Sequence, residues 1–192
     1  MEASRTPIEP HTMPRLQHVT DTRPLDGRKI LIIVENLPVP FDRRVWQESL
    51  TLAAAGAEVS VICPVGKGHQ ERYEEIDGIK IYRHGLWFEA ASALGYLLEY
   101  SAALFHETRL AWKGLFRSGF DTIHGCNPPD LIFLVALPFR LLGKKYIFDH
   151  HDISPELYEA KFNRRDFLWR MMRFLERCNF RTADVVISTN ES

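Results

Sequence analysis

Lys29-Ile30-Leu31-Ile32-Ile33-Val34 is the stretch of sequence that decides the fold. Every residue after Lys29 is aliphatic, and polar residues do not alternate with apolar ones. A strand with one face in water shows such alternation, so an unbroken aliphatic run predicts a strand that is buried on both faces. Helices must then cover both faces of the sheet that contains it.

The rest of the chain continues this alternation of strand and helix. Asp42 is expected to cap a helix that ends at Gly56, and Asn127-Pro128-Pro129-Asp130 reads as a second helix start with Asn127 as its cap. The helix over 131–142 is apolar all round, which predicts that it is buried, with a bend at Pro138. Further strands are expected over 58–63, 80–83, 120–124, 145–149 and 183–188, and further helices over 90–117 and 166–181. The repeated β-α-β order predicts an α/β fold: a Rossmann-like parallel sheet with helices on both faces.

Size and composition limit the class of protein. The 192 residues suit one domain, and a net charge of −1 argues against a nucleic-acid partner. Cys63, Cys126 and Cys178 are few and widely spaced, as in a reduced cytoplasmic protein. Residues 1–27 carry four prolines and no apolar periodicity, so we expect a disordered leader before a domain over 28–192.

The turn after the first strand contains no glycine. Dinucleotide-binding turns need glycines for close approach to a pyrophosphate, so the segment 35–44 argues against an NAD site. Arg43 and Arg44 open the following helix, where the helix dipole disfavours cations. Either Asp42 and Glu48 offset these charges, or an anionic ligand does.

Phe148-Asp149-His150-His151-Asp152-Ile153-Ser154-Pro155-Glu156 places polar residues where a strand ends. The carboxyl ends of parallel strands form the ligand crevice, so this cluster is placed for chemistry. We expect His151 to donate to sugar hydroxyls or to stabilise developing charge, with Asp152 orienting it or holding the acceptor. Adjacent residues of an extended chain point to opposite sides, so His150 and His151 are not expected to share a metal ion. His150 has the alternative of satisfying a buried hydrogen bond, and a metal-dependent hydrolase is the least favoured interpretation.

Two helices have a second interpretation. Arg170, Arg173, Arg177 and Arg181 form one stripe of the helix over 166–181, beside Leu168, Met171, Leu175 and Cys178. A core-facing apolar stripe with a solvated basic face is slightly favoured over a helix that lies on an anionic membrane. The helix over 90–117 is similarly either core or an apolar lip for a lipid-carried acceptor.

Four of these motifs together resemble the N-terminal domain of family-4 glycosyltransferases, which have the GT-B fold, in the branch that makes polysaccharides and glycolipids. The resemblance covers Lys29 to Ser192. Its motifs are Asn36-Leu37-Pro38 with Phe41-Asp42-Arg43-Arg44-Val45, Asn127-Pro128-Pro129-Asp130-Leu131, 148–156, and Ala183-Asp184-Val185-Val186-Ile187-Ser188.

The resemblance implies a retaining glycosyltransferase of two facing Rossmann-like domains, which needs no metal and no cofactor. The N-terminal domain mainly binds the acceptor, a glycan or a lipid-linked sugar, and the other domain binds a nucleotide-sugar donor. It implies catalytic roles for His151 and Asp152. The expected substrate-binding residues are Asn36, Phe41, Arg43, Arg44, Asn127, Asp130, His150 and Glu156.

The resemblance also implies a location and a missing partner. Such enzymes act at the cytoplasmic face of the membrane, often as peripheral proteins on polyprenyl-phosphate acceptors. The sequence stops after the last strand of the acceptor domain, so we expect the chain alone to be inactive or nearly so. A donor domain or partner subunit would supply the other half. The alternative is a non-catalytic subunit that recruits a split glycosyltransferase to the membrane.

Overall fold

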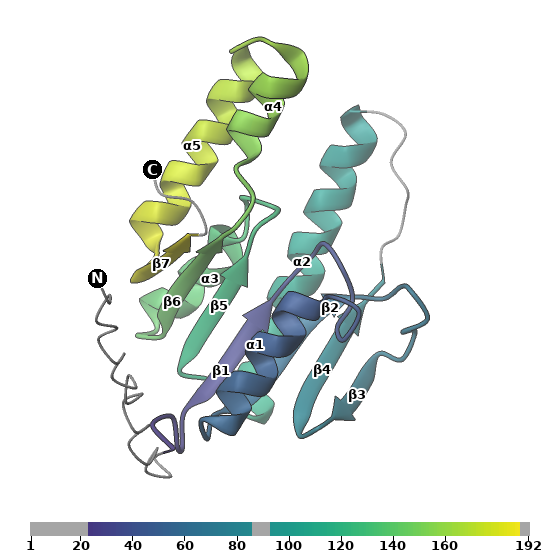
Figure 1. The fold of residues 1–192 in the computed structure, drawn as a ribbon, viewed down its shortest axis with the longest axis vertical. Coiled ribbons are helices and arrows are strands. Elements are labelled where there is room, and N and C mark those ends of the chain that lie inside the picture. The colour runs from purple at the N-terminus through teal and green to yellow at the C-terminus, as the bar shows by residue number, and fades with distance from the viewer. Residues whose placement is uncertain (1–22, 86–92, 189–192) are drawn as a thin grey trace, which may run out of the picture.

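The computed structural model describes residues 23–85 and 93–188, and for residues 93–101 it describes the backbone alone. Strands and helices alternate along the chain (Figure 1). The strands are β1 (Lys29–Ile33), β2 (Glu58–Pro64), β3 (Tyr73–Ile76), β4 (Ile79–His84), β5 (Thr122–Cys126), β6 (Lys145–His150) and β7 (Val185–Ser188). The helices are α1 (Arg43–Ala54), α2 (Ala93–Arg117), α3 (Phe133–Leu141), α4 (Ser154–Phe162) and α5 (Phe167–Thr182).

The strands form one seven-stranded sheet in the order β3-β4-β2-β1-β5-β6-β7. All neighbours are parallel except β3 and β4, which form an antiparallel hairpin at one edge. This arrangement confirms the Rossmann-like α/β fold. The chain leaves β1 toward β2 on one side and later enters β5 on the other side. The carboxyl ends of β1 and β5 therefore border a topological switch point, where open α/β sheets bind ligands.

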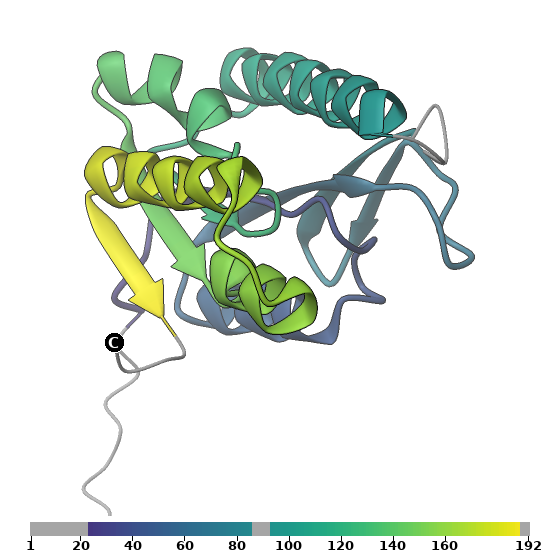
Figure 2. The ribbon, with the colours of Figure 1, turned by 90° about the horizontal axis from the view of Figure 1, so that it is seen from above.

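Helices cover the sheet on both faces, and the view in Figure 2 separates the two layers. One buried cluster joins Leu31 and Ile33 to α2 and to Phe139 of α3, and α5 lies on the same face. The other joins Ile30 and Ile32 to α1. Since Ile32 and Ile33 are both 0% exposed, β1 is buried on both faces, as its aliphatic run predicts.

Two elements have no counterpart among the expected ones. β3 precedes the turn Ile76-Asp77-Gly78-Ile79, so this turn closes a hairpin with β4 rather than leading into a single strand. Asp77 and Gly78 both have positive φ values, 50° and 79°, as in the two-residue turns that match the twist of a hairpin. The second unexpected element is α4, which follows the polar cluster at the end of β6.

The expectations for α3 are wrong in two respects. The helix begins at Phe133 rather than near Asn127, and its cap residue Ile132 supplies no side-chain hydrogen bond. The helix is also not buried on all sides, since Leu134 is 45% exposed and Leu141 is 81% exposed. Asn127 does not cap the helix because its amide bonds elsewhere, as described below.

The expected leader falls only partly on described residues, since 1–22 lie outside them, as do 90–92 of the helix expected over 90–117. Residues 24–27 form a turn in which the Leu25 amide donates to the Ala55 carbonyl at 3.0 Å, and Leu25 packs against the core on the α1 face. Among the described residues, no helix combines the length and the apolar character that crossing a membrane requires.

Candidate functional site

The carboxyl ends of β5 and β6 are tied together by Asn127, which is 1% exposed. Its Oδ1 accepts hydrogen bonds from the backbone amides of His151 and Asp152, at 2.9 and 3.1 Å. Its Nδ2 donates to the Asp152 carbonyl at 2.6 Å and to Asp130 Oδ1 at 3.1 Å. A single side chain therefore fixes the loop that carries the two predicted catalytic residues.

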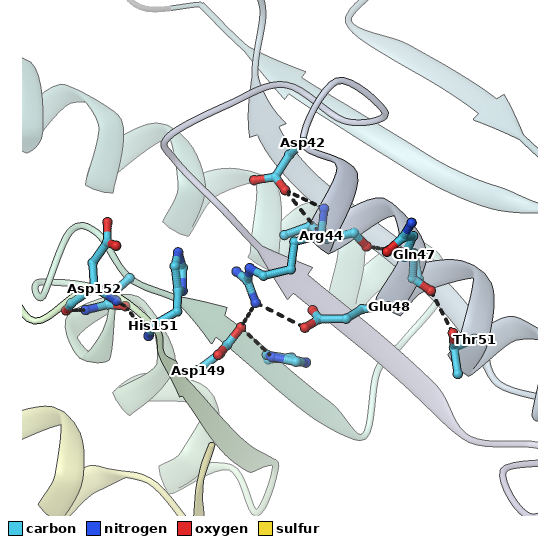
Figure 3. Close-up of polar contacts among 12 residues, drawn as sticks. Asp42, Arg44, Gln47, Glu48, Thr51, Asp149, His151 and Asp152 are labelled. Carbon is cyan, nitrogen blue, oxygen red and sulfur yellow. Dashed lines mark hydrogen bonds and ion pairs between the residues drawn. The ribbon is translucent and has the colours of Figure 1, made fainter. Parts of the chain in front are cut away.

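His151 and Asp152 are both half-buried in this loop. Figure 3 shows them on the segment that follows β6. The Nδ1 atom of His151 is buried and has no hydrogen-bond partner among the described residues. A buried ring nitrogen without a partner is costly, so Nδ1 is an unsatisfied group of this loop.

His150 points the other way, toward α5. Its ring contacts Phe148 and Phe180, with centroids 5.6 and 5.2 Å away, and its Nε2 lies 3.4 Å from Glu176 Oε1. The contact with Glu176 is a close ion-pair contact without hydrogen-bond geometry. This placement fits the interpretation of His150 as a core histidine, and it separates His150 from His151 as the alternation of side chains predicts.

Asp130 lies under the same loop and is 8% exposed. Burial raises the pKa of its carboxyl group, and the hydrogen bond from Asn127 opposes that rise. The Asp130 carbonyl accepts a hydrogen bond from Asn179 Nδ2 at 2.6 Å, and Asn179 Oδ1 accepts one from Tyr146 Oη at 2.9 Å. This buried network connects the loop to α5.

Arg44 forms an ion pair with the buried Asp149 and a second one with Glu48, at 3.0 Å (Figure 3). His124 Nε2 lies 3.6 Å from the same Asp149 carboxylate. Burial alone would raise the pKa of Asp149, but the neighbouring His124 and the hydrogen-bonded Arg44 outweigh it and lower that pKa to about 2. Intramolecular acids therefore offset the charge of Arg44. Glu48 was among the expected partners and Asp149 was not.

The other predicted binding residues lie nearer the surface. Asn36 and Arg43 are exposed, and Arg43 is the first residue of α1. Phe41 is 49% exposed, with Lys67 Nζ 5.8 Å from its ring centre. Glu156 lies in the first turn of α4 and is exposed. The structure thus brings His151, Asp152, Asn127 and Asp130 together, while Asn36, Phe41, Arg43 and Glu156 lie at the surface.

The four arginines of α5 differ in exposure and in ion pairing. Arg173 is half-buried and pairs with Glu176 at 2.9 Å and with Glu156 at 3.4 Å. Arg170, Arg177 and Arg181 are exposed and pair with no acid among the described residues. The apolar stripe expected to face the core is also partly in water, since Leu168 and Met171 are each 39% exposed.

Two groups of side chains bring metal-binding atoms within 4.8 Å of one another: Glu48, His124, Cys126 and Asp149, and Glu35, His84 and Glu107. In the first group the guanidinium of Arg44 already neutralises the acids. Burial raises the pKa of Cys126 far above its usual range, so its thiol stays protonated. In the second group, burial and the neighbouring Glu35 raise the pKa of Glu107 well above its usual range.

Sequence reasoning missed Asn179 and Glu176, both of which hold the site from α5. They are 0% and 3% exposed and stand three residues apart, so they share one face of the helix. The sequence does contain a signal for these two residues, namely a polar pair on a helix whose other faces are basic or apolar. The pair was missed because the arginines dominate the pattern of this helix.

Comparison with known proteins gives one family. The family model described as "Glycosyl transferase 4-like domain" matches residues 42–192. No curated protein sequence matches the chain at a significant level.

Solved structures with a similar fold include two large proteins. Sucrose-phosphate synthase from Thermosynechococcus elongatus aligns with a TM-score of 0.54 and 15% identity over 83% of this chain. UGT2 from Phytolacca americana, complexed with UDP-2fluoro-glucose and pterostilbene, aligns with a TM-score of 0.50 and 10% identity over 86% of this chain. The aligned parts make up 41% and 48% of those two proteins, so this chain spans less than half of each.

Proposed function

Because the chain belongs to the glycosyl transferase 4-like domain family, we propose that it forms the acceptor-binding half of a retaining glycosyltransferase. The sugar would come from a nucleotide-sugar donor that the other half of a GT-B enzyme binds, on the same polypeptide or on a partner subunit. The acceptor would be a glycan or a lipid-linked sugar. The enzyme would work at the cytoplasmic face of a membrane.

One observation carries the proposal: a buried asparagine presents His151 and Asp152 together at the carboxyl edge of the sheet. Three hydrogen bonds of Asn127 fix the backbone of both residues. Catalytic groups held in place before the substrate arrives lower the cost of reaching the transition state. His151 is half-buried, so the accessible part of its ring would meet a sugar hydroxyl.

In this proposal His151 hydrogen-bonds the transferred sugar or stabilises the charge that develops as the donor bond breaks, and Asp152 orients the acceptor hydroxyl. The buried Asp130 and His150 support the loop that carries His151 and Asp152. Asn36, Phe41, Arg43 and Glu156 are exposed and would contact the acceptor. In this proposal the donor half supplies the groups that stabilise the leaving diphosphate, so transfer by this half alone should be absent or nearly so.

Acceptor binding tests the proposal directly. Saturation-transfer NMR with octyl glucoside and maltotriose as acceptor probes and UDP-glucose as donor probe should show contacts with the acceptor probes. H151A and D152N should each weaken those contacts by roughly tenfold, the loss expected of a charged or buried hydrogen bond. H69A, which removes a histidine outside the site, is the control. Tighter binding of UDP-glucose than of either acceptor probe would contradict the assignment of halves.

A second function has an observation in its favour. α5 exposes aromatic rings beside arginines that pair with no acid among the described residues: Phe167 is 81% exposed and Phe174 is 62% exposed, close in sequence to Arg170 and Arg177. Aromatic and basic side chains on one helix are typical of membrane-surface helices. The chain would then recruit a catalytic partner to an anionic membrane.

Liposome flotation separates this function from the first. R170E with R177E should abolish flotation on phosphatidylglycerol vesicles and leave acceptor contacts intact. Arg173 is left unchanged because it pairs internally with Glu156 and Glu176. Flotation that survives the double substitution excludes α5 as the membrane surface.

A further inference from the structure

A cavity of about 350 Å³ lies between the β3–β4 hairpin and α2, toward the edge of the sheet opposite to β7 and away from His151. Its wall on α2 is made by one face of that helix, and its opposite wall by the end of β4 and the start of β3. The lining residues are Arg72, Tyr73, Tyr82, Arg83, His84, His106, Arg109, Leu110, Lys113 and Arg117. We call this cavity the basic pocket.

Four cations of the basic pocket are not neutralised by the part of the chain that the structure describes. Arg72, Arg109, Lys113 and Arg117 are exposed, and none forms an ion pair with an acid among the described residues. Arg109, Lys113 and Arg117 follow one another at intervals of four residues and so share one face of α2. The chain as a whole has a net charge of only −1, so this local excess of positive charge is a feature of the pocket rather than of the protein.

Arg83 differs from these four because it already forms an ion pair and hydrogen bonds within the chain. Its Nη2 contacts Glu74 Oε2 at 2.8 Å and donates to the Val39 carbonyl at 2.7 Å, while its Nη1 donates to the Glu71 carbonyl at 3.1 Å. Arg83 thus holds the hairpin in place. Arg72 lies against Gly85, where a Cβ would come within 3.1 Å of the guanidinium nitrogens, so the absence of a side chain there makes room for it.

The inner wall of the pocket carries hydrogen-bonding groups without partners. His84 is 2% exposed, and neither of its ring nitrogens has a hydrogen-bond partner among the described residues. The rings of His84 and His106 stack with centroids 6.3 Å apart and planes 8° apart. Burial, the neighbouring His106 and Arg72 lower the pKa of His84 to about 4, so its ring is neutral near pH 7 and retains one N–H donor.

The nearby acids do not cancel the positive charge. Glu74 is taken by Arg83, and Glu75 lies 3.4 Å from Tyr73 Oη. Burial and the neighbouring Glu35 raise the pKa of Glu107, which lies near His84, well above its usual range. Glu71 is exposed and forms no ion pair among the described residues.

We propose that the basic pocket binds a phosphate or diphosphate group, with Arg72, Arg109, Lys113 and Arg117 pairing with the anion. Guanidinium groups bind phosphate oxygens in a fork geometry, and the cavity is large enough for a diphosphate. The phosphate belongs either to a soluble ligand or to a lipid headgroup. This site is separate from the proposed acceptor site and does not depend on it.

Calorimetric titration with inorganic pyrophosphate at low salt tests the soluble source, and co-sedimentation with phosphatidylcholine vesicles, with and without phosphatidic acid, tests the lipid source. R109A/K113A should weaken binding to the effective probe by at least about tenfold. R28A/K161A removes one arginine and one lysine, both exposed and outside the pocket, and should change affinity by less than about twofold. In histidine side-chain NMR spectra, pyrophosphate should shift the resonances of His84 and His106.

The outcomes separate the two sources. Pyrophosphate binding that R109A/K113A weakens supports a soluble phosphate ligand. Binding to phosphatidic-acid vesicles alone, weakened by the same variant, supports a lipid phosphate. Equal losses in R109A/K113A and R28A/K161A would show unspecific attraction and overturn the site, as would the absence of binding to both probes. Since all four substituted residues are exposed, neither variant is expected to impair folding.

Discussion

At the scale of single residues, Asn127 links two loops of the candidate site. Its amide joins the loop after β5 to the loop after β6 through three hydrogen bonds of 2.6 to 3.1 Å. N127A leaves two backbone amides of the loop without an acceptor. We expect the free energy of unfolding to fall by about 2 to 3 kcal/mol, measured by urea denaturation.

The matched control is Asn163, which is exposed and adopts the left-handed conformation with φ 49° at the end of α4. N163G keeps that conformation accessible. It should change the free energy of unfolding by less than about 0.5 kcal/mol. A loss of the same size in both variants would mean that Asn127 contributes nothing special to the loop.

Asp149 gives the protein a predictable response to acid. Its folded pKa of about 2 lies below that of an unfolded aspartate, about 3.9. The ionised group therefore stabilises the fold fully above about pH 4, and this contribution disappears as the pH falls toward about 2. D149N should lower the free energy of unfolding by about 2 kcal/mol at pH 7 and by far less at about pH 2.

Denaturation curves across this pH range measure the effect. D77N, at an exposed aspartate in the hairpin turn, should leave the difference between the neutral and the acid measurement unchanged. If D149N lost as much unfolding free energy between neutral and acid pH as the unsubstituted protein does, the ion pair of Asp149 with Arg44 would not be the source of that loss.

The pairing of Arg44 also shows what a sequence can predict about a single residue. The helix dipole favours an anion near Arg44, and the local candidates included Glu48, which does pair with it. Asp149 stands 105 residues away and could not be named as the other partner. It reaches Arg44 only because β6 pairs with β5, and no local pattern encodes that register.

At the scale of elements, the hairpin of β3 and β4 depends on the backbone of Asp77 and Gly78. Gly78 has φ 79°, and no atom lies within 4 Å of the position where a Cβ would stand. G78A therefore causes backbone strain without any clash. We expect a loss of about 1 to 2 kcal/mol in the free energy of unfolding.

Gly114 in α2 is the opposite case. A Cβ at this position would also meet no atom within 4 Å, but the backbone is helical and its φ is not positive. G114A should raise the free energy of unfolding by up to about 1 kcal/mol, because alanine favours helix. Thermal denaturation should show that G78A lowers the stability of the protein and that G114A raises it. Changes in the same direction would contradict the conformational explanation.

The elements that the sequence predicted are those with a strong local pattern. An aliphatic run located β1, shorter apolar segments located β2 and β6, and Asp42 caps its helix as expected. β5 lies two residues later than expected. β3 was missed because Tyr73-Glu74-Glu75-Ile76 is short, polar and lies at the sheet edge. α4 was missed because Leu157 and Phe162 are 56% and 46% exposed, so no apolar periodicity marks it.

At the scale of the whole molecule, the sheet separates the two candidate sites. The basic pocket borders β4 and the His151 loop follows β6, with β2, β1 and β5 between them. Neighbouring strands lie about 4.8 Å apart, so four intervals give a separation of about 19 Å. The hydrogen bonds of Asn127 and the ion pair of Arg83 also share no residue.

This separation predicts that the two sites act independently. Substitutions more than about 10 Å apart without shared partners add within about 0.5 kcal/mol. H151A should therefore leave pyrophosphate affinity within about twofold of the unsubstituted protein, and R109A/K113A should leave octyl glucoside contacts unchanged. The free energies of unfolding of H151A, R109A/K113A and their combination complete a double-mutant cycle. A coupling clearly above about 1 kcal/mol would show that the central strands transmit changes between the sites, and the two would then have to be treated as one.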